Sequence, residues 1–167
     1  VIERIATEEG AAVIGWRDTP VNGDAIGREA RNSQPYIEQL FVRRPENLDE
    51  EGFERLLYKI RRRAEIEIDE SEIEGKEDFY VPSFSCRTII YKGLMLAPQI
   101  EKFYFELANP LVASALALVH QRFSTNTFPS WKLAHPYRYV AHNGEINTIR
   151  GNVSWMNARQ SVLDHPL

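Results

Sequence analysis

The sequence contains one cysteine, Cys86, among 167 residues. A single thiol excludes an internal disulfide framework and any metal site that needs several cysteines, and it is typical of a protein from a reducing compartment. No apolar run approaches the roughly 20 residues that a membrane-spanning helix needs. The N-terminal residues, VIERIATEEG, have neither the basic start nor the apolar stretch of a signal peptide.

An excess of positive charge is also missing, because 20 basic and 24 acidic residues give a formal net charge of -4. This balance provides no global field that would attract nucleic acid or an anionic membrane. The histidines lack the i, i+4 spacing of a helical zinc site, and no glycine-rich phosphate loop is visible. Hydrophobic residues make up 43% and charged residues 26% of the chain, which is ordinary for a globular domain. We therefore expect no metal site, no nucleic-acid partner and no membrane segment.

Apolar periodicity predicts a mixed α and β architecture. A short apolar run followed by the turn-rich RDTPVNGD predicts the first strand and its loop. Strands are expected at Ala11–Trp16, Tyr36–Arg43, in two runs within Phe79–Leu96, at Ala113–Phe123 and at Tyr137–His142. Helices are expected from about Asn47, at Pro98–Leu107 with Ile100, Phe103, Tyr104 and Leu107 on one face, and after Asn143-Gly144 with Ile149, Val153, Met156 and Leu163 facing inward.

The strongest helix signal begins at Asn47, which has the spacing of a capping box with Glu50. A stripe of buried residues is expected to follow at Phe53, Leu56, Leu57, Ile60 and Ala64. The basic triplet 61–63 is expected near the far end of this helix, where positive charge is favoured. It has two interpretations, a phosphate-binding patch or a solvated helix end, and the acidic, exposed segment expected at 65–78 favours the second.

Two polar segments follow predicted strands, HQRFSTNTFPSW at 120–131 and AHNGEINT at 141–148, and active-site groups commonly lie on such loops. Arg122 would carry its charge to the end of a buried strand, where a planar guanidinium either captures a ligand carboxylate or forms an internal salt bridge. Asn143-Gly144 is either a hairpin turn or an oxyanion hole made by a side-chain amide and a backbone N–H.

Other candidate residues have two readings each. Arg87 beside Cys86 would lower the thiol pKa and make the sulfur reactive, whereas the alternative is a small, partly buried core cysteine. His120 and His142 are expected to brace strand ends by hydrogen bonds, with direct catalysis as the alternative.

Together, HQRFSTNTFPSW and AHNGEINTIRGNVSWMNAR resemble the glutaminase domain of glutamate synthases. FYVPSFSCRTIIYKGLML and VIGWRDTPVN are similar to other segments of that family, so the resemblance covers nearly the whole chain and is strongest over 114–159. It implies an α+β fold, the four-layer α/β/β/α sandwich of class II, N-terminal-nucleophile (Ntn) amidotransferases. The chain begins at Val1 without a start methionine or cysteine and ends at Leu167. Residues 1–167 are therefore expected to be the central portion of one such domain, without its first strands and C-terminal part.

The resemblance also implies a reaction. A free N-terminal cysteine attacks the side-chain amide of L-glutamine, with its own amine as base, and glutamate and ammonia are released. Ammonia then reaches a synthase domain of the same polypeptide, which aminates 2-oxoglutarate. No cofactor is expected in this chain, but FMN and an iron–sulfur cluster are expected in the full-length enzyme. A small NAD(P)H-oxidising subunit or ferredoxin would supply electrons. The expected location is the cytoplasm, or the plastid stroma in a plant or alga.

Site residues follow by position. Arg122 would bind the α-carboxylate of glutamine; Phe123, Thr125 and Asn126 would line the same pocket; Asn143 and Gly144 would form the oxyanion hole. The isolated chain is expected to be inactive because it has no N-terminal cysteine. Two alternatives stay open, a glutamine-binding or sensing module without catalysis and a thiol hydrolase that uses Cys86.

Overall fold

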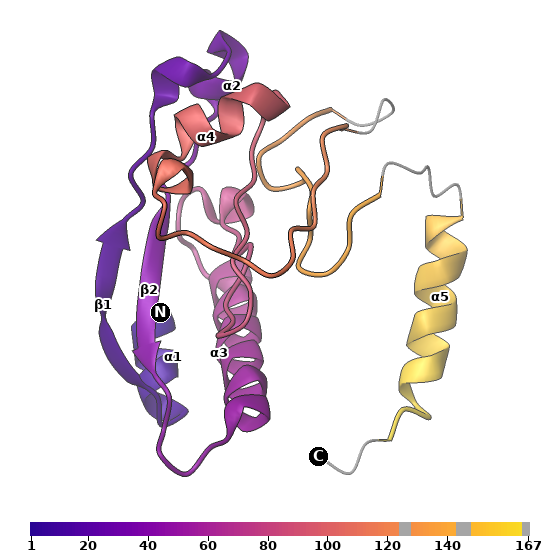
Figure 1. Cartoon of the computed structure of the whole chain (residues 1–167). Coiled ribbons are helices and arrows are strands. Elements are labelled where there is room, and N and C mark those ends of the chain that lie inside the picture. Colours follow the sequence, from indigo (N-terminus) through magenta and orange to yellow (C-terminus); the bar gives the residue numbers. More distant parts are fainter. Residues whose placement is uncertain (124–127, 143–147, 165–167) are drawn as a thin grey trace.

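The structure, a computed structural model, describes residues 1–123, 128–142 and 148–164 (Figure 1). The predicted site residues Thr125, Asn126, Asn143 and Gly144 lie outside the described residues. The helices are α1 (Ile2–Glu8), α2 (Arg28–Asn32), α3 (Glu50–Glu70), α4 (Ile100–Phe103) and α5 (Ile149–Gln160), and the strands are β1 (Ala12–Asp18) and β2 (Glu38–Arg43). Short 3₁₀ turns are η1 (Gly23–Ala25), η2 (Lys76–Asp78), η3 (Ala97–Gln99) and η4 (Phe105–Ala108). Among these helices none is both long and apolar enough to cross a bilayer.

The two strands β1 and β2 form an antiparallel pair in which Trp16 lies opposite Leu40 and Ala12 opposite Arg43. The strands predicted at Ala11–Trp16 and Tyr36–Arg43 are therefore confirmed. The connection between the strands carries η1 and α2, and the side chain of Asn22 accepts a hydrogen bond from the backbone N–H of Asp24 to cap the first of these. In Figure 1 the β1–β2 pair lies beside α3, and α1 lies close to both of them.

Helix α3 is the long predicted helix, but its start and its far end both differ from the prediction. Asp49, not Asn47, is the N-cap: its carboxylate accepts from the N–H of Gly52 at 2.7 Å. The predicted stripe is confirmed, since Phe53, Leu57, Ile60 and Ala64 are buried and Leu56 packs beside them. Ile5 and Ala6 of α1 complete this core, so the amphipathic face of α3 is buried by α1 and the β1–β2 pair.

The arginine triplet is not a solvated helix end, because α3 continues to Glu70. Residues 65–70 of the segment expected to be acidic and exposed instead form its last turns, whereas 72–75 and 77–78 are exposed as predicted. Arg61 is buried and pairs with Glu65 at 2.8 Å, and Arg62 contacts the same carboxylate. Arg63 reaches across to α1, where it pairs with Glu8 at 2.7 Å and Glu9 at 2.6 Å. Arg63 therefore ties α3 to α1, whereas Arg61 and Arg62 pair within α3, and the triplet presents no free phosphate-binding patch.

The segment 79–96 was predicted to contain two strands, and this prediction is wrong: the described residues form no strand there. Its backbone groups are partly satisfied by serine side chains. The hydroxyl of Ser85 accepts from the N–H groups of Arg87 and Thr88, and that of Ser83 accepts from Ile90. A β-rich pattern becomes a strand only when another backbone pairs with it, and β1 and β2 pair with each other instead.

The helical prediction for 98–107 is confirmed, although the segment is divided into η3, α4 and η4. Its apolar face builds a second core in which Phe103 and Tyr104 are buried with Ile26 and Trp131, and Ile100 and Leu107 pack against them. The rings of Phe103 and Tyr104 meet edge to face with centroids 4.8 Å apart. This core holds the segment around Trp131 against the α2 end of the molecule.

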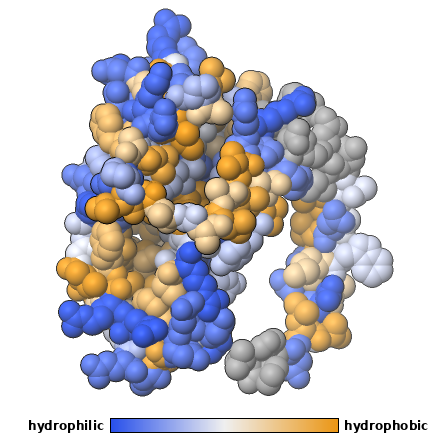
Figure 2. Space-filling model, in the orientation of Figure 1, coloured by the Kyte–Doolittle hydropathy of each residue, from blue (hydrophilic) through white to orange (hydrophobic). Residues whose placement is uncertain are grey.

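Three predictions in the C-terminal third are wrong. Residues 113–123 form no strand within the described part, and all of them except the half-buried His120 and Phe123 are exposed, with Leu116 at 83% and Val119 at 78% of full exposure. In place of a strand at 137–142, Tyr137 and Val140 form one bridge across a tight turn. Helix α5 is present as predicted, but none of its residues is buried, and it lies apart from the rest of the chain with apolar side chains on its surface (Figures 1 and 2).

Candidate active site

The candidate site is defined by the two polar loops, of which the structure describes the approaches. Arg122 is exposed and Phe123 half-buried at the end of the first loop's described part. Within the described residues no carboxylate forms an ion pair with Arg122, so the internal salt bridge that was the alternative interpretation has no support there. The remaining predicted residues, Thr125, Asn126, Asn143 and Gly144, lie outside the described residues.

The two loops approach one another through three histidines. The ring of His135 lies 4.9 Å from that of His120 and 5.8 Å from that of His142, measured between centroids. His120 comes two residues before Arg122, and its Nε2 donates a hydrogen bond to the Arg122 carbonyl. His142 directly precedes Asn143. We call His120 and His142 the loop entrances, because each stands at the start of its loop's critical residues. The structure brings them together, since both rings contact the ring of His135.

His135 belongs to a turn, residues 132–137, that is anchored by a buried cation. Lys92 is 5% exposed, and its ammonium donates to the backbone carbonyls of Lys132 at 2.8 Å and Ala134 at 2.9 Å. The same ammonium lies over the rings of Tyr80, 5.0 Å away, and Tyr137, 4.7 Å away. Carbonyl dipoles and aromatic faces together supply the negative potential that a buried ammonium needs.

The electrostatics of this region follow from burial. Burial lowers the pKa of Lys92 to about 8, and the positive charge of Arg138 lowers it further. Burial also lowers the pKa of His135, with the neighbouring His120 and His142 contributing in the same direction. Burial and these neighbours therefore favour the neutral form of His135, whose ring contacts the other two imidazoles. Within the described residues no group of acidic, histidine or cysteine side chains could hold a metal ion.

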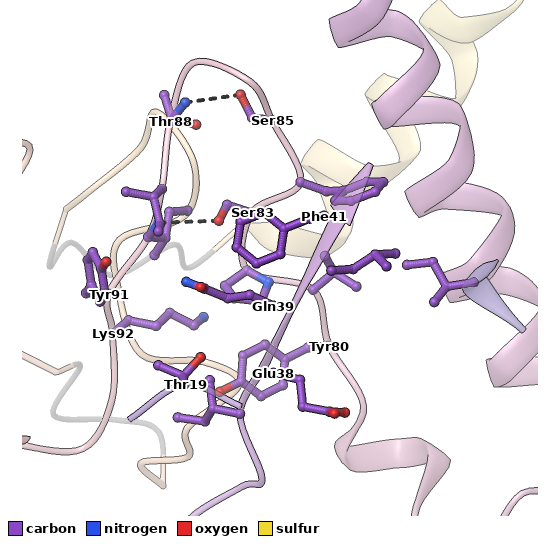
Figure 3. Close-up of a pocket in the computed structure, with 18 of the residues that line it drawn as sticks. Thr19, Glu38, Gln39, Phe41, Tyr80, Ser83, Ser85, Thr88, Tyr91 and Lys92 are labelled. Carbon is purple, nitrogen blue, oxygen red and sulfur yellow. Dashed lines mark hydrogen bonds between the residues drawn. The ribbon is translucent and has the colours of Figure 1, made fainter. Parts of the chain in front are cut away.

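A separate cavity of about 540 Å³ lies between the β1–β2 pair and segment 78–92 (Figure 3). Its walls are largely aromatic and aliphatic, with Phe41, Tyr80 and Tyr91 among the lining residues. Neither Arg122 nor Phe123 lines it, so the structure does not join the predicted carboxylate-binding residues to this cavity. Lys92 lines the cavity and also holds the turn beside the loops; its side chain is seen extending inward in Figure 3.

Cys86 does not have the environment of a nucleophile. Partial desolvation of the sulfur by its neighbours, followed by the carboxylates of Glu54 and Glu50, raises the pKa of the thiol to about 11. Arg87 was the group expected to lower this pKa, but its guanidinium is bonded to Glu50 and Glu51. The residue is exposed, so the partly buried core position expected of it is also wrong. A reactive thiolate needs a positive neighbourhood, and Cys86 has a negative one.

The whole chain, residues 1–167, matches the model of the class-II glutamine amidotransferases, and it belongs to that family. It is 46% identical over 166 residues to the glutamate synthase [NADPH] large chain of Azospirillum brasilense, covering 99% of this chain and 11% of the relative. The corresponding protein of Bacillus subtilis is 49% identical over 160 residues, covering 95% and 10%. The chloroplastic ferredoxin-dependent glutamate synthase of Oryza sativa is 41% identical over 167 residues, covering 100% and 10%. The chain thus spans about a tenth of the length of these relatives, and the resemblance inferred from its polar loops is confirmed.

Sequence reasoning missed Lys92 and His135. A signal for the first was available: Lys92 is the only charged residue in IIYKGLML, so a strand-like apolar run was carrying a cation that needed partners. His135 offered no comparable signal, because nothing in LAHPY indicates contact with residues on either side of it in the chain. The bracing role expected of His120 is supported by its bond to the Arg122 carbonyl, although no strand end is present there.

Proposed function

We propose that this chain supplies the glutaminase part of a glutamate synthase, which hydrolyses L-glutamine to glutamate and delivers the ammonia to a 2-oxoglutarate-aminating synthase domain of the same polypeptide. The observation that carries the proposal is identity of 46% and 49% to glutamate synthase large chains over nearly the whole of this chain, in a family of glutamine amidotransferases. Residues 1–167 are part of one amidotransferase domain, and the complete domain has the four-layer α/β/β/α arrangement.

In this proposal Arg122 binds the α-carboxylate of glutamine, since an exposed guanidinium without a partner among the described residues is free to form a bidentate pair. Phe123, Thr125 and Asn126 line the same pocket. The side-chain amide of Asn143 and the backbone N–H of Gly144 stabilise the oxygen that becomes negative when the amide is attacked. Support for a shared site comes from the contacts of His120 and His142, which precede these residues, with His135.

The attacking group is an N-terminal cysteine whose own amine removes the thiol proton. Cys86 does not fill that role, because its pKa is raised to about 11. In the whole enzyme FMN and an iron–sulfur cluster belong to the synthase part, and electrons come from a small NAD(P)H-oxidising subunit or from ferredoxin. The names of the relatives contain both NADPH and ferredoxin. The enzyme is located in the cytoplasm, or in the plastid stroma in a plant or alga.

An isotope experiment on the whole polypeptide tests the reaction. Glutamine labelled with ¹⁵N at the side-chain amide is supplied with ¹³C-labelled 2-oxoglutarate and a reductant, and the products are separated by mass, so that glutamate made from 2-oxoglutarate is distinguished from glutamate left by hydrolysis of glutamine. Glutamate synthase activity places the ¹⁵N in the α-amino group of glutamate newly made from 2-oxoglutarate. Glutamine labelled instead at its α-nitrogen is the matched control, since its label must stay with the original carbon skeleton.

The outcomes separate the alternatives. Labelled ammonia without labelled glutamate would indicate a free-standing glutaminase. Saturable glutamine binding in calorimetry with no product at all would indicate the sensing module and would overturn the proposed reaction.

A further inference from the structure

Lys92 is a buried cation with no carboxylate partner among the described residues. Its ammonium is bonded to the carbonyls of Lys132 and Ala134 and lies over the rings of two tyrosines, Tyr80 and Tyr137. Removing a charge from water without an opposite charge is unfavourable by several kcal/mol. An apolar residue of the same length would avoid that penalty, so a purely space-filling role does not account for an ammonium at this position.

The backbone of Lys92 is fixed independently of its side chain. Tyr104 is buried in the second core and donates its hydroxyl to the Lys92 carbonyl at 2.7 Å. Tyr91, the preceding residue, stacks edge to face on Tyr104 with centroids 5.0 Å apart and donates to Glu106 at 2.7 Å. The backbone of Lys92 is therefore held by the aromatic core, and its side chain extends from that core to the carbonyls of Lys132 and Ala134.

What the cation holds is the turn that carries His135. The two accepting carbonyls come from residues 132 and 134, which immediately precede His135. Tyr137, on the other side, packs against both partners: its ring centroid lies 4.6 Å from that of His135 and 4.7 Å from the Lys92 ammonium. Its hydroxyl donates to the Leu133 carbonyl at 2.7 Å and closes the turn.

Through His135 the turn reaches both polar loops. The rings of His120, which precedes His135 in the chain, and His142, which follows it, both contact the His135 ring. His120 lies two residues before Arg122, and His142 lies directly before Asn143. A displacement of the turn is thus transmitted to the entrance of each loop. For a reaction that needs substrate and oxyanion donors in register, an error of about 1 Å can reduce the rate by about a hundredfold.

We propose that Lys92 is a positioning residue of the active site, which fixes the 132–137 turn so that His135 holds the two loop entrances at their working separation. This inference rests on the proposed function, because the loops matter only if glutamine is bound and hydrolysed between them. Lys92 itself touches neither substrate nor reacting atoms. The lowered pKa of the Lys92 ammonium is consistent with its burial, and the geometry alone carries the assignment.

The test is Lys92→Met in the whole polypeptide, with glutaminase kinetics measured as glutamate released. Methionine retains the apolar stem and loses both hydrogen bonds. The expected result is a fall in kcat/KM of about tenfold or more, with an increase in the KM for glutamine. Lys92→Arg, which can donate to two carbonyls, recovers part of the loss. Lys102→Met is the matched control, since Lys102 is exposed on α4, and it is expected to leave both constants unchanged.

The KM separates positioning from simple destabilisation. Loss of folded enzyme lowers the apparent kcat but leaves KM unchanged, because KM does not depend on the concentration of active sites. A KM for Lys92→Met within twofold of the wild-type value would overturn the inference. If Lys92→Met does not fold, His135→Ala decides in its place: His135 is half-buried, and the same increase in KM is expected. A wild-type enzyme that hydrolyses no glutamine would instead refute the proposed function.

Discussion

The missing side chain of Gly93 makes room for the indole of Trp131. A Cβ built on Gly93 would lie 2.3 Å from Cζ3 of that ring and 2.6 Å from Cε of Met95. Trp131 is itself fixed, because it is buried and its Nε1 donates to the Ala30 carbonyl at 2.9 Å. The aromatic core that supports Lys92 therefore depends on a glycine at the next position in the chain.

Gly93→Ala is expected to lower the free energy of unfolding by about 1–3 kcal/mol, because the added methyl group forces the indole out of its packed position. Chemical denaturation followed by tryptophan fluorescence measures this. Gly151→Ala on α5 is the control: nothing lies within 4 Å of its Cβ, and alanine should strengthen that helix by up to about 1 kcal/mol. Equal stability of the two variants would contradict the close packing at Gly93.

A second pair of variants tests the orientation of α3. Ile60 is fully buried, whereas Ile66 in the same helix is 48% exposed. Ile60→Ala should destabilise the protein by about 2–5 kcal/mol, through lost burial and the cavity left behind. Ile66→Ala removes the same atoms from a half-solvated site and should cost about 1 kcal/mol or less. Urea unfolding of both variants gives the comparison, and a reversal of the order would mean that α3 presents its other face.

Helix α3 and the β1–β2 pair show which features of the fold could be predicted from the sequence alone. The stripe on α3 and the β1 and β2 strands were predicted correctly, because the periodicity of apolar side chains is a local property. The strands expected at 79–96 and 113–123 were wrong for the opposite reason. A strand exists only beside a partner, and the apolar runs around Ile90 and Leu116 specify a preference without specifying that partner. Arg61 was misjudged similarly, since its burial depends on tertiary contacts.

The candidate site divides along the same line. The chemistry of Arg122, with a planar guanidinium beside polar loop residues, was legible in the sequence. The contact between the loop entrances was not, because it passes through His135 and Lys92, which are separated by more than forty positions. Distance in the chain hides such relationships, whereas a buried cation in an apolar run could have revealed that one existed.

Cys86 is expected to be a slow nucleophile. Its pKa is raised from 9.0 to about 11, which leaves about a hundredfold less thiolate at neutral pH than an unperturbed thiol has. Alkylation by iodoacetamide, followed by mass spectrometry, should accelerate about tenfold per pH unit from pH 7 to 9.5 without a plateau. Glu54→Gln should accelerate the reaction by removing a carboxylate that disfavours the thiolate. A plateau below pH 9 would show that the thiol is activated.

The same reasoning predicts that Cys86→Ser leaves glutamine hydrolysis by the whole polypeptide unchanged. It also predicts no glutamine turnover by a purified polypeptide of residues 1–167, whose only thiol is Cys86. Turnover by that polypeptide which disappears in Cys86→Ser would establish the thiol-hydrolase alternative.

Arg122→Ala should weaken glutamine binding in the whole polypeptide. Leaving the substrate carboxylate unpaired costs about 2–5 kcal/mol, so the KM for glutamine rises while chemistry on bound substrate is less affected. The sharper readout is selectivity, because the wild type should prefer glutamine over its α-amide analogue and Arg122→Ala should not. Arg150→Ala, an exposed arginine on α5, is the control. If Arg122→Ala kept the wild-type preference for glutamine over the α-amide analogue, Arg122 would not be the residue that binds the α-carboxylate.

Asn143→Ala should have the complementary effect. An amide that donates to the oxygen only as it becomes negative stabilises the transition state more than bound glutamine, and losing one such donor lowers kcat by on the order of a hundredfold or more. The KM should change little. Asn157→Ala on α5 controls for a general effect of removing an asparagine. Because Arg122 and Asn143 act on opposite ends of one substrate, the two variants should move different constants. If both moved only KM, the oxyanion role would pass from Asn143 to another donor, while the shared site would stand.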